Sequence, residues 1–161
     1  MKLLLLLLFT FPSLSAFGQT PLKDEDLSSE QWVYQVVTDE MTDEVNKSAI
    51  LRSINAVNLS FPYNGDTHAY IHVSGNAKAI IVVEKGQIPY GLDEVLIRFD
   101  DDKAYKLRIY TSTSSAFLLP KSVVKKFAKH NLLKIEVPFY EDGKHIFNFN
   151  VNGLDLNKIK N

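Results

Sequence analysis

The sequence predicts a mainly β protein, an antiparallel β-sandwich or open barrel of about seven to nine strands with one short helix near residues 121–130. Short segments in which apolar and polar residues alternate recur at spacings of about 8–12 residues, as expected for half-buried strands. Turn-forming pairs such as Asn64-Gly65 and Gly75-Asn76 separate these segments. A single segment has apolar residues at helical spacing, so we expect one helix.

Residues 1–18 have the features of a cleaved secretory signal peptide. Met1-Lys2 forms a short positive start, Leu3 to Phe11 is apolar, and Ala16-Phe17-Gly18 has the small-x-small pattern of a cleavage site. The apolar run is shorter than the ~20 residues that a membrane-spanning helix needs. We therefore expect cleavage before Gln19 and no transmembrane anchor in the mature chain.

Composition limits the compartment and the classes of partner. The chain contains no cysteine, which rules out thiol catalysis and thiolate metal sites. Small extracellular animal domains usually depend on disulfides, so this exported chain is expected in a bacterial periplasm or outside a bacterium. Its net charge is −1, with 18 Lys+Arg against 19 Asp+Glu. No basic stripe predicts binding to nucleic acid, and no polybasic run predicts binding to anionic lipid.

The first part of the mature chain is expected to be a flexible lead-in followed by strands. Residues 19–30 are polar and acidic, which is typical of a mobile terminus. Residues 32–37 are β-branched and aromatic and predict the first strand, and residues 38–47 predict a charged turn region. Residues 48–61 fit either one bent strand or two. A strong turn signal, Pro62-Tyr63-Asn64-Gly65-Asp66, follows them.

Residues 31–161 are expected to form a single domain. Its remaining part predicts more strands and the helix. A continuous apolar run over residues 79–83 predicts a buried strand, and residues 111–115 predict a hydroxyl-rich loop. Pro120 fits the first turn of the helix and Asn131 its end. The apolar stripe of this helix is formed by Val123, Val124, Phe127 and Ala128. Alternating strands are expected over 67–74, 94–100, 104–111, 132–138 and 144–151.

No set of residues predicts a metal or cofactor site. His68 and His72 lie four apart, but on a strand their Cα atoms are about 13 Å apart, which is too far for one ion. We interpret them as part of a polar face. The Asp100-Asp101-Asp102 run could contribute to calcium binding, but it lacks the EF-hand pattern and fits a solvated hairpin turn. His130 is expected to interact with the dipole at the end of the helix.

Catalytic patterns are equally weak. The hydroxyl groups of residues 111–115 lack the motif of a serine nucleophile. Glu136 and Glu141 could form the carboxylate pair of a glycosidase. Glu136, however, alternates with apolar neighbours and is expected to face solvent. We therefore predict no catalytic residues and no cofactor.

Aromatic residues near strand ends and turns are the best candidates for a functional surface. If they lie at one rim of a sandwich, they would form a surface for binding a partner. The alternative is that each one fills the core or a turn. The candidate partner-binding residues are Trp32, Tyr63, Tyr90, Tyr110 and Tyr140.

Several motifs, taken in order, resemble a family of exported bacterial proteins. They are Trp32, Asp39-Glu40-Met41-Thr42-Asp43, Phe61-Pro62-Tyr63, Val95 to Asp101, Phe117 after the serine-rich loop, the Lys-rich helix, and Phe147 to Leu154. The chain is similar to the VasI/TagO-like group of type VI secretion accessory proteins and to related phage- or plasmid-borne exported proteins. This resemblance implies a periplasmic or secreted β-sandwich with a non-enzymatic role, and it implies no catalytic residues.

These observations favour an exported, non-enzymatic protein that acts by binding a partner, most simply another envelope protein. An accessory role in a secretion system would fit the resemblance. Two alternatives stay open: an envelope hydrolase acting on glycan or peptidoglycan, which needs two carboxylates in one cleft, and an exported immunity or exclusion protein.

Overall fold

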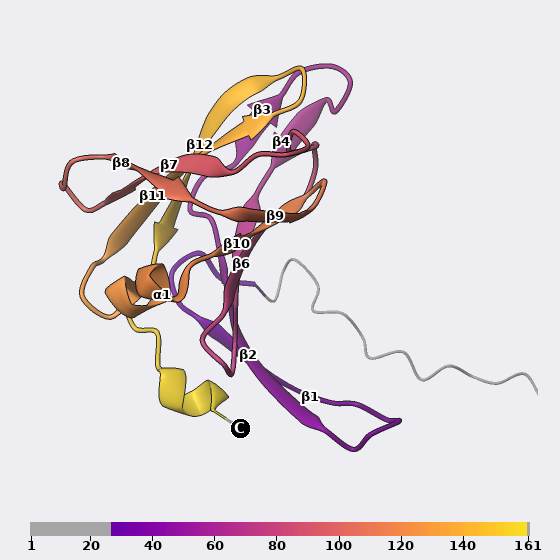
Figure 1. Ribbon diagram of the computed structural model, residues 1–161, viewed down its shortest axis with the longest axis vertical. Helices are drawn as coiled ribbons and strands as arrows, with labels where there is room; N and C mark the ends of the chain where they lie inside the picture. Colours follow the sequence, from indigo (N-terminus) through magenta and orange to yellow (C-terminus); the bar gives the residue numbers. More distant parts are fainter. Residues whose placement is uncertain (1–26, 161) are drawn as a thin grey trace, which may run out of the picture.

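The computed structural model describes residues 27–160, so the predicted signal peptide and most of the predicted lead-in lie outside the described residues. Across residues 27–160 the chain forms twelve strands in three antiparallel sheets, together with one α-helix and one 3₁₀-helix (Figure 1). The predicted fold class, a mainly β antiparallel structure with one short helix, is confirmed. The number of strands exceeds the expected seven to nine because the expected strand over 104–111 is divided in two. In addition, Gly65–Thr67 and Ala116–Leu119 were not expected to form strands of their own.

The larger sheet has six strands, and the second has four. In spatial order the larger sheet contains β1 (Val33–Thr38), β2 (Val45–Arg52), β5 (Ala69–Ser74), β6 (Ala79–Val83), β10 (Ala116–Leu119) and β9 (Tyr110–Thr113). The four-stranded sheet contains β12 (Gly143–Asn150), β11 (Leu132–Phe139), β7 (Glu94–Phe99) and β8 (Tyr105–Arg108). A two-stranded hairpin pairs β3 (Val57–Leu59) with β4 (Gly65–Thr67).

Alternating side chains of the two large sheets meet in one hydrophobic core. Along β5, β7 and β11 every second residue is buried, as the sequence pattern predicts. Each fully buried large apolar side chain contributes about 1.5–3 kcal/mol relative to exposure, so this core supplies the main stabilisation. Both sheets contribute fully buried side chains, including Leu51, Ile71 and Ile81 from one and Ile97, Ile135 and Phe149 from the other.

Helix α1 (Lys121–Phe127) closes one end of this core with Val123, Val124 and Phe127. The Phe127 ring lies 6.0 Å from the Trp32 ring and 6.3 Å from the Phe99 ring, measured between centroids. The helix is shorter than expected, and Ala128, which was assigned to its apolar stripe, is exposed. The 3₁₀-helix η2 (Leu156–Ile159) follows β12.

The chain passes from one sheet to the other at Ile109. Strands β8 and β9 follow each other directly but belong to different sheets. The expected single strand over 104–111 is therefore divided at this residue, which is buried. Part of the expected loop over 111–115 is strand β9 at the edge of the larger sheet. The threonines there are β-branched, so they suit an edge strand as well as a loop.

No helix in the part of the chain that the structure describes is both long and apolar enough to cross a membrane.

Candidate functional site

The five aromatic residues expected to form one surface occupy different environments. Trp32 is only 6% exposed, its ring packs on Phe127, and its Nε1 donates a hydrogen bond to the Val151 carbonyl at 3.2 Å. Its assignment to a partner-binding surface is therefore corrected. An indole whose apolar body is buried and whose N–H has an internal acceptor is a core residue.

Tyr63 and Tyr140 lie apart from any cavity described below. Tyr63 is partly buried and packs against the core after a turn in which its N–H donates to the Ser60 carbonyl. Tyr140 is 54% exposed in the turn between β11 and β12, and its N–H donates to the Gln87 carbonyl at 2.7 Å.

Tyr90 and Tyr110 come together at a cavity of about 460 Å³, which we call the tyrosine slot. The slot is lined by residues 88 and 90–93 on one side and by residues 109–114 on the other. Tyr90 is fully exposed and Tyr110 is 72% exposed. The structure thus places two of the five predicted aromatic residues at one site, beside edge strand β9.

Backbone hydrogen bonds connect the two walls of the slot at both ends. At one end the Ile88 N–H donates to the Ser114 carbonyl at 2.6 Å, and at the other the Ile109 N–H donates to the Asp93 carbonyl at 2.8 Å. The Thr111 hydroxyl also donates to the Leu92 carbonyl. These bonds hold the two walls of the slot in place without a ligand.

The wall formed by residues 88 and 90–93 contains a turn between the two hydrogen-bonded ends of the slot. Pro89 and Gly91 flank Tyr90, and Gly91 has a φ of 76°, a conformation that suits glycine. The Leu92 N–H donates to the Pro89 carbonyl at 3.3 Å, which closes a turn. Tyr90 lies inside this turn and extends into solvent.

The chemistry of the slot resembles that of a protein-recognition surface. Ile88 and Ile109 are almost completely buried, and residues 111–114 contribute four hydroxyl groups. Asp93 is the one charged residue of the lining. Interface centres are depleted in charge and enriched in tyrosine, and antibody paratopes combine tyrosine with serine and glycine. Ile88 and Asp93 were not among the candidate residues, although the Pro89-Tyr90-Gly91 sequence between them is typical of a turn.

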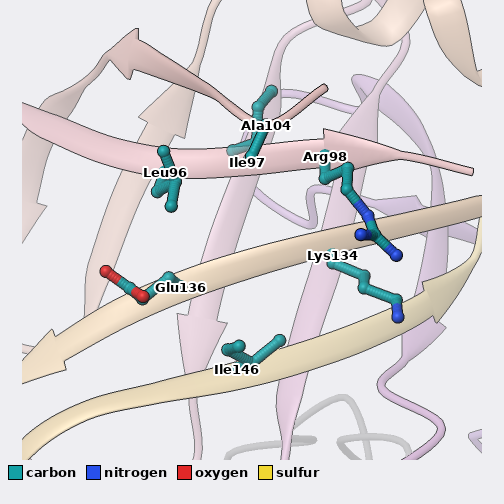
Figure 2. Close-up of a pocket in the computed structure, with 7 residues that line it drawn as sticks. All are labelled: Leu96, Ile97, Arg98, Ala104, Lys134, Glu136 and Ile146. Carbon is teal, nitrogen blue, oxygen red and sulfur yellow. The ribbon is translucent and has the colours of Figure 1, made fainter. Parts of the chain in front are cut away.

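A second, smaller hollow of about 220 Å³ lies on the outer face of the four-stranded sheet (Figure 2). Leu96 and Ile146 expose apolar surface there, and Glu136 lies between them in the pairing of β7, β11 and β12. The charged ends of Arg98 and Lys134 lie together at one side of the hollow (Figure 2).

The residues considered for catalysis are placed on solvent-facing surfaces. Glu136 forms an ion pair with Lys144 at 2.9 Å, and Glu141 occupies the exposed turn between β11 and β12. The hydroxyl groups of residues 111–114 line the tyrosine slot instead of forming a free loop.

The histidines considered as metal ligands have other environments. The His68 Nδ1 lies 3.1 Å from the Ser53 hydroxyl, and burial lowers the pKa of His72. Within residues 27–160 no three His, Cys, Asp or Glu side chains are grouped so that they could hold a metal ion.

Asp100, the first residue of the acidic run, has a structural role. One carboxylate oxygen accepts hydrogen bonds from the Asn131 and Leu132 N–H groups at 3.0 and 2.8 Å. The other lies 2.9 Å from the Nδ1 of His130, so Asp100 at the start of the β7–β8 turn pairs with a side chain from the segment between α1 and β11. The Leu132 N–H first, and then the His130 side chain, hold the pKa of Asp100 below its ordinary value.

We expect Asp100→Asn to reduce the acid sensitivity of the fold. A lowered pKa in the folded state means that Asp100 stabilises the protein above its ordinary pKa, and that this stabilisation is lost as the pH falls through the lowered value. Asparagine keeps an acceptor oxygen but does not titrate in this range. The variant should therefore be less stable than wild type at neutral pH, and the difference should shrink on acidification.

Thermal unfolding midpoints of both proteins, from neutral pH to below the usual carboxyl range, measure this difference. Asp39 and Asp142 also have lowered pKa values, but they are unchanged in the variant and cancel in the comparison. Parallel profiles at all pH values would show that Asp100 does not contribute to the pH dependence.

No protein-family model, curated protein sequence or solved structure matches this chain.

Proposed function

We propose that this protein is an exported, non-enzymatic binding protein that engages a partner protein of the bacterial envelope through the tyrosine slot. The observation that carries the proposal is the joint placement of the exposed Tyr90 and Tyr110 at a preformed cavity of about 460 Å³. The signal peptide predicted over residues 1–18 supports a periplasmic or secreted location. An accessory role in a secretion system is the most specific form of this proposal.

Three features of the slot suit a protein partner. Both tyrosine rings are already exposed, so binding buries them without disrupting the core. The hydrogen bonds at the two ends fix the walls, which lowers the conformational cost of binding. Strand β9 is the edge of the larger sheet, and edge strands are common sites for pairing with another chain.

We expect the Tyr90→Ala/Tyr110→Ala variant to lose its partner while keeping its fold. A central interface tyrosine is worth about 2 kcal/mol or more, which is about 30-fold in affinity. The test is affinity capture from envelope extract with the mature chain from Gln19, with quantitative mass spectrometry of the bound proteins. The expected result is a specific protein that wild type captures and the double variant does not.

The matched control is Tyr140→Ala, which removes an exposed tyrosine away from the slot. It should capture the same protein as wild type. Equal capture by the double variant, or equal loss with Tyr140→Ala, would contradict the assignment of the slot. Circular dichroism of each variant verifies that the fold is retained.

A further inference from the structure

We infer that this chain also binds a second copy of itself, with the tip of the β1–β2 hairpin of one molecule docked on the outer face of the four-stranded sheet of another. This inference uses different residues from the tyrosine slot and does not depend on it. It follows from the complementary charge and apolar pattern of two surfaces that the fold leaves uncovered.

The first surface is the acidic tip, defined as residues 39–44 between β1 and β2. Four of these six residues are carboxylates, and Met41 between them is 92% exposed. Val36 and Val45 on the adjoining strands are also exposed. The hairpin therefore combines four carboxylates with exposed apolar side chains, which a second surface of matching character would cover.

The acidic tip is an ordered turn. The Asp39 carboxylate accepts hydrogen bonds from the Met41 and Thr42 N–H groups, both at 2.9 Å. The Asp39 N–H donates to the Glu44 carbonyl and the Asp43 N–H to the Asp39 carbonyl, both at 2.8 Å. The bond from Met41 and then that from Thr42 lower the pKa of Asp39, so this carboxylate is charged at neutral pH. A preorganised loop loses little conformational entropy on docking.

The second surface is the basic face, the outward side of β12, β11, β7 and β8. Lys106 pairs with Glu94 at 3.1 Å, and Lys144 pairs with Glu136 at 2.9 Å. Three further cations of the same face have no carboxylate within ion-pair distance among the described residues. They are Arg98, Arg108 and Lys134.

Two of these cations are in direct register. Arg98 on β7 lies opposite Lys134 on β11, and like charges in that position destabilise a sheet. The Arg98 Nε is buried and has no hydrogen-bond partner, which adds a further cost. Carboxylates of the acidic tip would neutralise both cations.

The apolar parts of the two surfaces also match. Beside Arg98 and Lys134, the hollow of about 220 Å³ exposes Leu96 and Ile146 (Figure 2). Carboxylates precede and follow Met41 in the tip, at Glu40 and Asp43. Arg98 and Lys134 lie at one side of the hollow, and Glu136 in its lining is already paired with Lys144. Methionine is flexible and fills irregular apolar hollows, so we place its side chain there.

The contact must join two molecules. Figure 1 shows the β1–β2 hairpin projecting from one end of the molecule, whereas β7, β8 and β11 lie at the opposite end. A tip therefore cannot fold back on its own basic face. Because the two surfaces differ, the contact is head-to-tail, and repetition of it produces rings or open chains of molecules.

Charge reversal tests the contact in solution. Sedimentation velocity of the mature chain should show association that rises with protein concentration and falls with added salt. Glu40→Lys and Lys134→Glu should each weaken association about tenfold or more, because each places like charges together. The Glu40→Lys/Lys134→Glu double variant restores opposite charges and should recover association. Glu84→Lys, an exposed residue outside both surfaces, should behave as wild type.

Cysteine cross-linking tests which surfaces meet. Because the chain has no cysteine of its own, the introduced cysteines are the only thiols. A Met41→Cys chain mixed with an Ile146→Cys chain should form a mixed disulfide dimer on mild oxidation. A Met41→Cys chain mixed with a Tyr90→Cys chain is the control and should not. A chain that stays monomeric up to about 1 mM, or a double variant no better than the single ones, would overturn the inference. Equal cross-linking to both partners would also overturn it.

Discussion

Replacing Phe127 by alanine should lower the free energy of unfolding by about 3–5 kcal/mol, the range for a buried phenylalanine. Phe127 is completely buried and contacts both Trp32 and Phe99, so its removal leaves a cavity where α1 closes the core. Small domains are stable by only about 5–15 kcal/mol, so a loss of this size is a large share of the total.

Urea unfolding followed by tryptophan fluorescence measures this effect directly, because the single Trp32 packs on Phe127. The matched control is Lys125→Ala in the same helix, an exposed position where we expect a change within about 0.5 kcal/mol. A loss below about 1 kcal/mol for Phe127→Ala would mean that α1 does not pack on the core as described.

We expect Gly86→Ala to lower the free energy of unfolding by about 2–5 kcal/mol, the second large effect. The backbone of Gly86 has a φ of 93°, where a side chain costs about 1–2 kcal/mol. A Cβ there would also lie 2.6 Å from two ring carbons of Phe139 and 2.9 Å from the Leu59 Cδ1. Displacing such buried side chains adds about 1–3 kcal/mol.

Gly153→Ala separates the two contributions. Gly153 has a φ of 80°, but a Cβ there would have no atom within 4 Å, so it should lose only the conformational part, about 1–2 kcal/mol. Urea unfolding of both variants gives the comparison. Equal losses would show that Phe139 and Leu59 do not crowd Gly86. The next two residues, Gln87 and Ile88, form backbone hydrogen bonds with Tyr140 and Ser114. The close packing of Gly86 therefore also positions one wall of the tyrosine slot.

The regular strands could be predicted from the sequence because their burial alternates strictly. Ile71, Ile97 and Phe149 lie on the apolar side of strands whose alternation was expected, and all are buried. Strand β10 was missed because its four residues form an apolar run without alternation. The change of sheet at Ile109 could not be predicted, since alternation gives the face of a strand but not the sheet to which it belongs.

The candidate site was only partly predictable for a similar reason. The candidate aromatic residues were chosen because they lie near strand ends or turns. Tyr90 and Tyr110 are indeed exposed, but Trp32, chosen for the same reason, is buried. Residue type does not distinguish these cases, because aromatic residues serve both cores and interfaces. The slot itself depends on hydrogen bonds between residues 88–93 and 109–114, which no local pattern in the sequence reveals.

Site-specific photo-cross-linking in intact cells tests most directly whether the tyrosine slot binds a partner protein. A photoreactive phenylalanine analogue would replace Tyr110 in one chain and Tyr140 in another, both being exposed tyrosines. We predict a discrete cross-linked adduct with an envelope protein from position 110 and none from position 140. No adduct from position 110, or the same adduct from both positions, would contradict the assignment of the slot as the partner-binding site.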